Sequence, residues 1–128
     1  MKVVSKLCFI LLLFIFLALK AEAMNFSEAY EQTIKKPMLM LIYADWASNY
    51  QEYINIMKSL ETKYSDRLNF VELNIANPDT ASFNSKFHIY PNLPYMLMFR
   101  DGGKVSRYIQ RNCANDYSCV ETKIKNFL

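Results

Sequence analysis

Two short runs of unbroken apolar residues, at positions 38–44 and 95–99, most strongly limit what this chain can fold into. A strand with one solvated face alternates apolar and polar residues, whereas a strand covered on both faces is apolar throughout. Both runs have the length of a strand and are too short for a typical buried helix. The chain is therefore predicted to contain a sheet with helices on both sides.

Segments with helical spacing lie next to the predicted strands. A short helix is expected from an N-cap at Asn25 to about residue 35, because Glu28 follows the cap at the third position and Pro37 ends the segment. A longer amphipathic helix follows, with Ser48 or Asn49 as its cap. Its apolar face consists of Tyr50, Tyr53, Ile54, Met57, Leu60 and Tyr64.

The second half of the chain continues the alternation. A strand at residues 68–75 precedes a helix that is expected to start with Asn77 as its cap and Pro78 as its first residue. After the strand at 95–100, the glycine pair within 101–104 predicts a hairpin turn into an antiparallel strand. A last helix, capped by Asn115, would bury Tyr117, Val120, Ile124 and Phe127.

This order of elements predicts an α/β domain with a mixed β-sheet flanked by helices on both faces. Strand–helix–strand units favour parallel pairing, and the closing hairpin adds an antiparallel strand. Met38, Met40, Met96 and Met98 fall on two of the strands. We interpret them as flexible core filling rather than as a metal-binding stripe.

Residues 1–23 are expected to be a secretory signal peptide rather than part of the fold. Lys2 and Lys6 precede an apolar run of 13 residues, and Ala21 and Ala23 form a small-x-small cleavage site. The run is shorter than the ~20 residues of a membrane-crossing helix. Cleavage would export a single domain, residues 24–128, to the periplasm or the exterior. The alternative is an uncleaved anchor that tethers the same domain outside the cytosol.

The charge of the exported segment argues against one class of partner. Without Lys2, Lys6, Lys20 and Glu22, the 15 basic and 12 acidic side chains become 12 and 11. A formal charge of +1 offers no basic face for a phosphate backbone, so we expect no nucleic-acid binding. After cleavage of the signal peptide we also expect no membrane contact. We also expect no cofactor.

Cys113 and Cys119 are the cysteines of the exported segment. Such a pair is more often bridged than free in an oxidising compartment, and we expect a structural disulfide. A displaced redox pair and two free thiols are the alternatives. Zinc is not expected, because only His88 could join the two cysteines as a ligand. We interpret His88 as a polar loop residue rather than a catalytic one.

Several strings in this order resemble the thioredoxin family. Lys36-Pro37, an apolar strand and Tyr43-Ala44-Asp45-Trp46 are similar to the strand that leads into that family's active-site loop. Leu93-Pro94 and the strand after it resemble the family's proline loop, and Asp101-Gly102 resembles its hairpin turn. The resemblance implies a thioredoxin-like fold, a cis bond between Leu93 and Pro94, and a peptide-binding groove between the two loops.

The resemblance does not extend to the positions of the family's active-site residues. Ala47 and Tyr50 stand at the two positions of the Cys-x-x-Cys motif, and Leu41 stands where the family has a buried acidic residue that assists proton transfer. Dithiol exchange needs a thiolate nucleophile and a resolving thiol, and this loop supplies neither. Trp46 is open to two interpretations, a binding residue or a partly buried packing residue, and Tyr50 is equally open to binding or to covering the core.

These observations favour an exported, redox-inactive module that binds a protein or an extended peptide segment, or supports folding. The binding residues would be those of the two loops, namely Trp46, Ala47, Ser48, Asn49, Tyr50, Leu93 and Pro94. The alternative is a thiol–disulfide oxidoreductase, acting in redox homeostasis, that uses Cys113 and Cys119. A third interpretation is a structural subunit of a larger complex.

Overall fold

Strand β1 (Met38–Tyr43) lies in the middle of a four-stranded sheet, where both of its faces are covered. The computed structural model describes residues 24–128, and the signal peptide predicted at 1–23 lies outside the described residues. The elements are α2 (Phe26–Gln32), β1 (Met38–Tyr43), α3 (Tyr50–Tyr64), β2 (Asn69–Asn74), α4 (Thr80–Asn84), β3 (Tyr95–Arg100), the turn η1 (Asp101–Gly103), β4 (Val105–Ile109), α5 (Arg111–Ala114) and α6 (Tyr117–Phe127).

The strand order in the sheet is β2-β1-β3-β4, with β1 parallel to β2 and antiparallel to β3. The predicted parallel pairing is therefore confirmed for the β1–α3–β2 unit and wrong for β3. Helix α3 has 15 residues and carries the chain back along the sheet, whereas α4 has 5 and does not. Strand β3 consequently starts at the end of the sheet where β2 finishes, and runs in the opposite direction.

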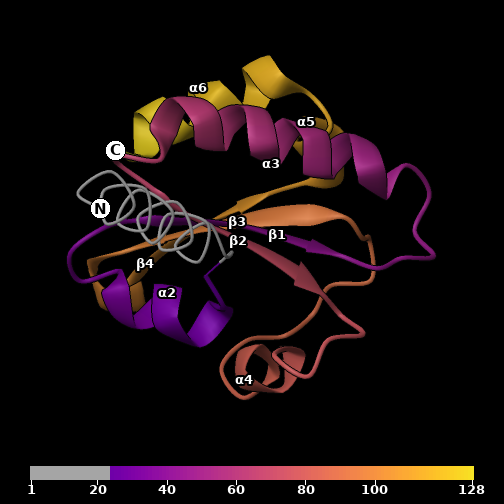
Figure 1. The fold of residues 1–128 in the computed structure, drawn as a ribbon, viewed down its shortest axis with the longest axis horizontal. Coiled ribbons are helices and arrows are strands. Elements are labelled where there is room, and N and C mark those ends of the chain that lie inside the picture. Colours follow the sequence, from indigo (N-terminus) through magenta and orange to yellow (C-terminus); the bar gives the residue numbers. More distant parts are fainter. Residues whose placement is uncertain (1–23) are drawn as a thin grey trace, which may run out of the picture.

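Helices cover the two faces of this sheet as separate layers (Figure 1). Helices α3, α5 and α6 lie on one face, and α2 and α4 lie on the other. Because successive residues of a strand point to opposite faces, Leu39 and Leu41 join the first layer, while Met40 and Ile42 join the second. The predicted mixed sheet with helices on both faces is confirmed.

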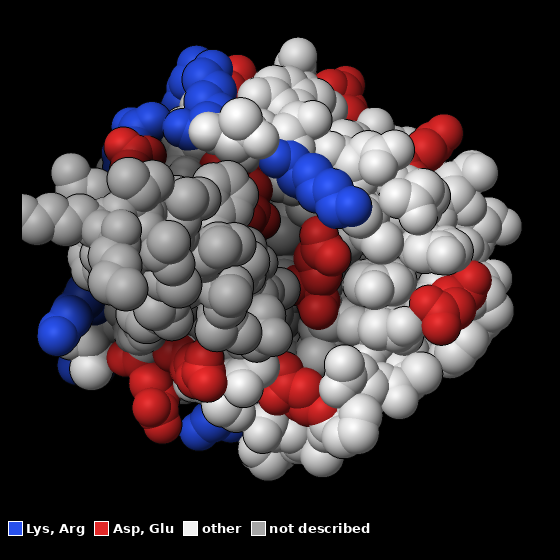
Figure 2. Space-filling view, in the orientation of Figure 1, with Lys and Arg blue, Asp and Glu red and all other residues white. Residues whose placement is uncertain are grey.

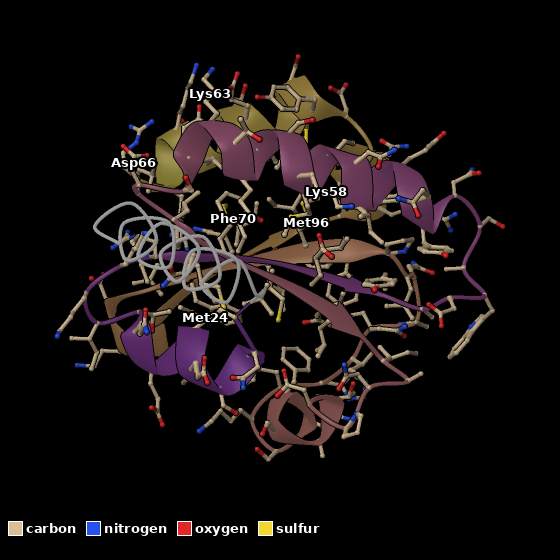
Figure 3. The ribbon with its side chains drawn as sticks, in the orientation of Figure 1. Met24, Lys58, Lys63, Asp66, Phe70 and Met96 are labelled. Carbon is tan, nitrogen blue, oxygen red and sulfur yellow. A yellow bond between two sulfur atoms is a disulfide. The ribbon has the colours of Figure 1, made fainter. Side chains whose placement is uncertain are left out.

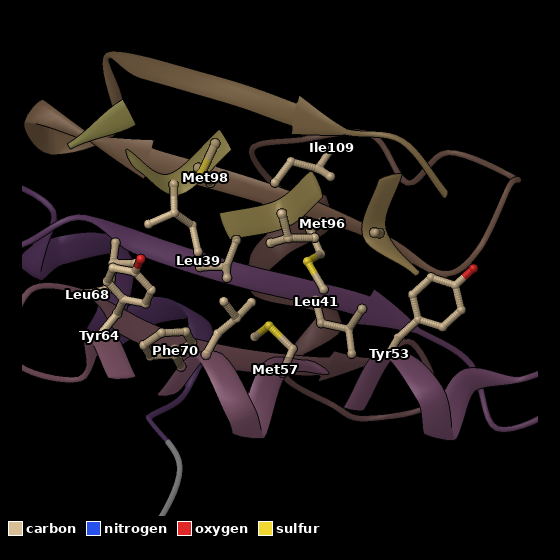
Figure 4. Close-up of a cluster of buried hydrophobic side chains, with 14 of the residues drawn as sticks. Leu39, Leu41, Tyr53, Met57, Tyr64, Leu68, Phe70, Met96, Met98 and Ile109 are labelled. Atoms are coloured by element: carbon tan, nitrogen blue, oxygen red, sulfur yellow. The ribbon is translucent and has the colours of Figure 1, made fainter. Parts of the chain in front are cut away.

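The core on the α3 side contains aromatic, aliphatic and sulfur-containing side chains (Figure 4). Met96 and Met98 lie in this cluster, whereas Met38 and Met40 lie in the cluster on the opposite face. All four are at most 1% exposed. They fill the core, as predicted, and they do not form one stripe.

Three of the predicted helix caps differ from those in the structure. Asn49 is the N-cap residue of α3, one of the two expected, but it has a φ of 61° and makes no side-chain cap bond to the helix. Helix α4 begins at Thr80, because Asn77 uses its side chain to accept a hydrogen bond from Asp79 N in a turn before the helix. Asp116, rather than Asn115, caps α6. The predicted cap at Asn25 is confirmed by a 2.9 Å hydrogen bond from Glu28 N.

The hairpin turn between β3 and β4 is confirmed as well. Asp101, Gly102 and Gly103 have φ values of 55°, 69° and 85°. A Cβ atom at Gly103 would overlap the phenol ring of Tyr30 on α2. Glycine is therefore required there both by the backbone conformation and by the close approach of α2.

Candidate functional site

Three segments meet at one end of the sheet. The register pairs Ile42 with Tyr95 and Met96 with Ile109. The end of β1, the start of β3 and the end of β4 are therefore neighbours. The loop at residues 44–49, the Leu93–Pro94 loop and the start of α5 accordingly lie at this same end.

The loop after β1 presents Trp46 to solvent and turns Tyr50 inward. Trp46 is 72% exposed, so its interpretation as a packing residue is wrong. Ser48 and Asn49 are exposed and Ala47 is partly buried. Tyr50 is partly buried against the α3-side core and stacks on Tyr43, with ring centroids 5.6 Å apart and an interplanar angle of 5°. An aromatic pair thus covers the core at the second cysteine position of the motif.

The proline loop has the predicted conformation, because the Leu93–Pro94 bond is cis. Pro94 is buried and Leu93 is partly buried. Tyr95 lies behind this loop, and its hydroxyl oxygen accepts a 3.1 Å hydrogen bond from Tyr90 N. Burial raises the pKa of Tyr95.

Cys113 and Cys119 form a disulfide that joins α5 to α6 on the α3 side of the sheet (Figure 3). The S–S distance is 2.08 Å and the Cα atoms are 5.4 Å apart. Cys113 is 6% exposed and belongs to the α3-side core, while Cys119 is only partly buried. The bridge expected from the sequence is thus present, and one of its two cysteines is accessible to solvent.

Contacts to α3 hold both helices that carry the disulfide. The hydroxyl of Tyr53 donates a 3.4 Å hydrogen bond to the carbonyl of Arg111 at the start of α5. Glu121 of α6 accepts hydrogen bonds from Lys63 Nζ at 2.7 Å and from the Tyr64 hydroxyl at 2.9 Å. The hydrogen bond from Lys63, followed by that from Tyr64, lowers the pKa of Glu121.

A carboxyl group missed by the sequence analysis lies one strand away from Leu41. Leu41 is fully buried and pairs with Glu72 of β2 in the parallel register. Glu72 is partly buried beneath α3, and this burial raises its pKa, while Lys58 opposes the shift. Only the register could have identified it, because strand pairing places Glu72 beside Leu41 across 30 residues of chain.

The surface in Figure 2 mixes basic and acidic side chains over the described part of the face shown. Among residues 24–128, no group of three or more His, Cys, Asp or Glu side chains is arranged to hold a metal ion. His88 is exposed. None of the helices in this described range is both long enough and apolar enough to span a bilayer.

Comparison with known proteins identifies proteins that are similar to this chain. The family model described as Thioredoxin matches residues 18–122. A thiol:disulfide interchange protein, TxlA of Synechococcus elongatus, is 42% identical over 53 residues, a match that covers 38% of this chain and 28% of the relative. The chain therefore spans little more than a quarter of the length of that curated relative.

Two solved structures resemble the fold. A complex of ferredoxin:thioredoxin reductase and thioredoxin f2 contains a chain that matches with a TM-score of 0.64 at 20% identity, covering 80% of this chain and 86% of that one. Deadhead, a germline-specific thioredoxin of Drosophila melanogaster, matches with a TM-score of 0.58 at 16% identity, covering 80% and 91%.

These findings correct the expectation of a redox-inactive binding module. The curated relative is a thiol:disulfide interchange protein, and the structure contains a disulfide between Cys113 and Cys119. The absence of cysteines at positions 47 and 50 therefore does not by itself imply the absence of redox chemistry. Because the family model covers most of the sequence and the fold agrees with it, the chain belongs to the thioredoxin family.

Proposed function

We propose that this protein is a thiol–disulfide oxidoreductase in which Cys113 and Cys119 form the exchangeable pair. One observation carries the proposal: the two cysteines are joined in a disulfide, with Cys119 partly exposed and Cys113 buried in the α3-side core. Exchange requires a sulfur that a thiolate can reach and a second thiol that can leave and return. The interchange activity of the curated relative supports the same assignment.

The two cysteines take different roles because their surroundings differ. A substrate thiolate attacks the Sγ of Cys119, the less buried of the two cysteines, the bond to Cys113 breaks, and Cys113 leaves as a thiolate that takes up a proton. A second substrate thiolate then attacks the mixed disulfide and releases Cys119 as a thiolate. The substrate dithiol is oxidised to a disulfide and the protein pair is reduced, and the reverse sequence reduces a substrate.

Helix α6 favours the thiolate of Cys119. Cys119 lies in the first turn of this 11-residue helix, where the backbone N–H groups and the helix dipole stabilise negative charge. The carboxylate of Asp116 acts in the opposite direction, because its negative charge disfavours a thiolate close to it. Its hydrogen bond from Cys119 N places this charge beside the cysteine. The reactivity of Cys119 would follow from the balance of these two effects.

The partners of this reaction are proposed to be proteins that present an extended segment. The thioredoxin f2 structure was solved in complex with a reductase, which supports a protein partner. The exposed Trp46, with Ala47, Ser48 and the Leu93–Pro94 loop, lies at the same end of the sheet as α5 and would contact that segment. Tyr50 would support the loop from below through its stack on Tyr43.

Export is also part of the proposal. The basic start, the apolar run and the small-x-small site in residues 1–23 support a cleaved signal peptide that delivers residues 24–128 to the periplasm or exterior. An oxidising compartment favours the bridged form of the cysteine pair. The mass of the protein purified from its own cell would show whether the chain starts at Met24.

The test is turnover of a small disulfide, with thioredoxin-type insulin reduction as a second substrate. The reduced wild-type domain should react with uncharged dithiodipyridine, and the Cys113→Ser, Cys119→Ser double variant should not. Cys113→Ser alone should trap a mixed disulfide on Cys119, visible by intact mass. No reaction of the reduced wild type, or a reaction that the double variant retains, would overturn the proposed function.

A further inference from the structure

A polar surface cavity of about 480 Å³ lies beside α5, the helix that carries Cys113. Its lining combines three asparagines, a glutamine, an arginine and a tyrosine: Asn92, Tyr108, Gln110, Arg111, Asn112 and Asn115. The residues come from the proline loop, the end of β4 and α5. Arg111 and Cys113 are two residues apart in α5, so the cavity and the disulfide share one helix.

The charge of this cavity is one-sided. Arg111 is the charged residue of the lining, and no carboxylate lines it. Within residues 24–128, Arg111 makes no salt bridge, since the ion pairs there involve Lys63, Lys125, Arg67 and Arg100. The hydrogen bond from Tyr53 to its carbonyl fixes the backbone of Arg111 and leaves the guanidinium unpaired. A guanidinium in this state is suited to bind a carboxylate.

The rest of the lining suits a peptide backbone. The amide side chains of Asn92, Gln110 and Asn112 each offer both donors and acceptors, as the N–H and C=O groups of an extended chain require. Tyr108 supplies an aromatic wall that is 45% exposed. Its ring is held by Tyr90 and Tyr95, with centroid distances of 5.2 and 5.3 Å. A wall that is already ordered loses little conformational entropy on binding.

A second copy of this chain does not fit the site as well as an acidic segment does. The stretch from Lys104 to Arg111 carries three basic residues and no acidic one. Pairing this edge of the sheet with its own copy would bring like charges together, which is unfavourable. A partner with acidic residues meets complementary charge over the same stretch.

We propose that this cavity is a specificity site that binds an acidic side chain beside the reacting cysteine of an extended protein substrate. The proposal rests on the proposed function for its chemistry, since it names the substrate class of the Cys113–Cys119 pair. Arg111 binds the carboxylate, the amide side chains bind the backbone, and Tyr108 packs against the neighbouring residue.

The test compares two peptides in which cysteine is activated as a pyridyl disulfide and flanked by glutamates in one and lysines in the other. The reduced wild-type domain should react about two- to fivefold faster with the glutamate peptide, as expected for a partly exposed charge pair. Arg111→Gln should remove this preference, and Arg111→Lys should retain part of it. Arg107→Gln, which removes a cation of the same basic stretch outside the cavity lining, is the matched control and should keep most of the preference.

Two further measurements separate this proposal from the proposed function. Reaction with uncharged dithiodipyridine should be equal in the wild type and Arg111→Gln. The second measurement is an NMR titration of the oxidised domain with a glutamate peptide that has serine in place of cysteine. This binding requires no chemical step, and it should be lost in Arg111→Gln. If the reduced wild-type domain does not react with dithiodipyridine, the proposed function alone is overturned. Equal rates for the two peptides, or unchanged peptide binding in Arg111→Gln, would overturn the specificity site.

Discussion

The side-chain carboxylate of Asp116 accepts a 3.2 Å hydrogen bond from the backbone N–H of Cys119. This contact caps α6 and places a negative charge beside the more accessible cysteine of the disulfide. The same residue therefore starts the helix and opposes formation of a thiolate in its first turn. Replacements at position 116 can separate these two effects.

Asp116→Asn is expected to make reduced Cys119 more reactive. Asparagine retains a capping oxygen but removes the charge, so the helix N-terminus stabilises the thiolate with less opposition. The rate of iodoacetamide alkylation should rise near neutral pH, and the pH–rate profile should move to lower pH. Asp116→Ala should also lose about 1 kcal/mol of stability through loss of the cap. An unchanged pH–rate profile for Asp116→Asn would show that the carboxylate does not act on the sulfur.

Removal of the disulfide is expected to lower the free energy of unfolding by about 2 kcal/mol, because the bridge closes a short loop in the unfolded chain. The cysteines are six positions apart, which keeps the effect at the low end for disulfides. Urea unfolding of the wild type with and without reductant measures the difference. The Cys113→Ser, Cys119→Ser variant is the control, and reductant should not change its midpoint.

Glu121→Gln is expected to destabilise the domain at neutral pH and to have less effect in acid. The hydrogen bonds from Lys63 and Tyr64 hold the pKa of Glu121 below its ordinary value of 4.5 in the folded state. A depressed folded pKa stabilises the fold above the ordinary value, and this contribution is lost as the pH falls from there through the folded pKa. Thermal melts between pH 3 and pH 7 should show the curves of wild type and variant converging at low pH. A constant difference would contradict the pKa shift.

Gly103→Ala is expected to destabilise the domain by about 1–3 kcal/mol or more. Alanine is strained at a φ of 85°, and its Cβ would overlap the Tyr30 ring. Chemical unfolding measures the loss. Lys104→Ala, at the next and exposed position, is the control and should change stability by less than about 0.5 kcal/mol.

Trp46→Ala is expected to change the reaction rate with a protein substrate, and Tyr50→Ala is expected to change stability. Trp46 is exposed, so its loss should leave stability within about 0.5 kcal/mol of the wild type and slow the reaction with a protein substrate. Tyr50 packs on Tyr43 and the core, so its loss should lower the melting temperature. Dithiodipyridine should react equally with wild type and Trp46→Ala. Strong destabilisation by Trp46→Ala would show that Trp46 belongs to the core.

Local features of the sequence were enough to predict much of the fold. The apolar runs of β1 and β3, the cap at Asn25 and the glycine turn at 101–104 all depend on residues close together in the chain. Their physical causes, burial on both faces, a side-chain hydrogen bond and positive φ angles, act within a few residues. The resemblance to a known family added the cis bond before Pro94.

Tertiary structure alone decided the direction of β3, the exposure of Trp46, the place of Glu72 beside Leu41, and the cavity that joins Asn92 to Arg111. Each of these depends on which distant segments become neighbours. An apolar run indicates that a strand is buried, but it does not determine whether the neighbouring strand is parallel or antiparallel to it. The two cysteines could likewise be recognised in the sequence, whereas the burial of Cys113 and the accessibility of Cys119 arise only when α5 and α6 pack against α3.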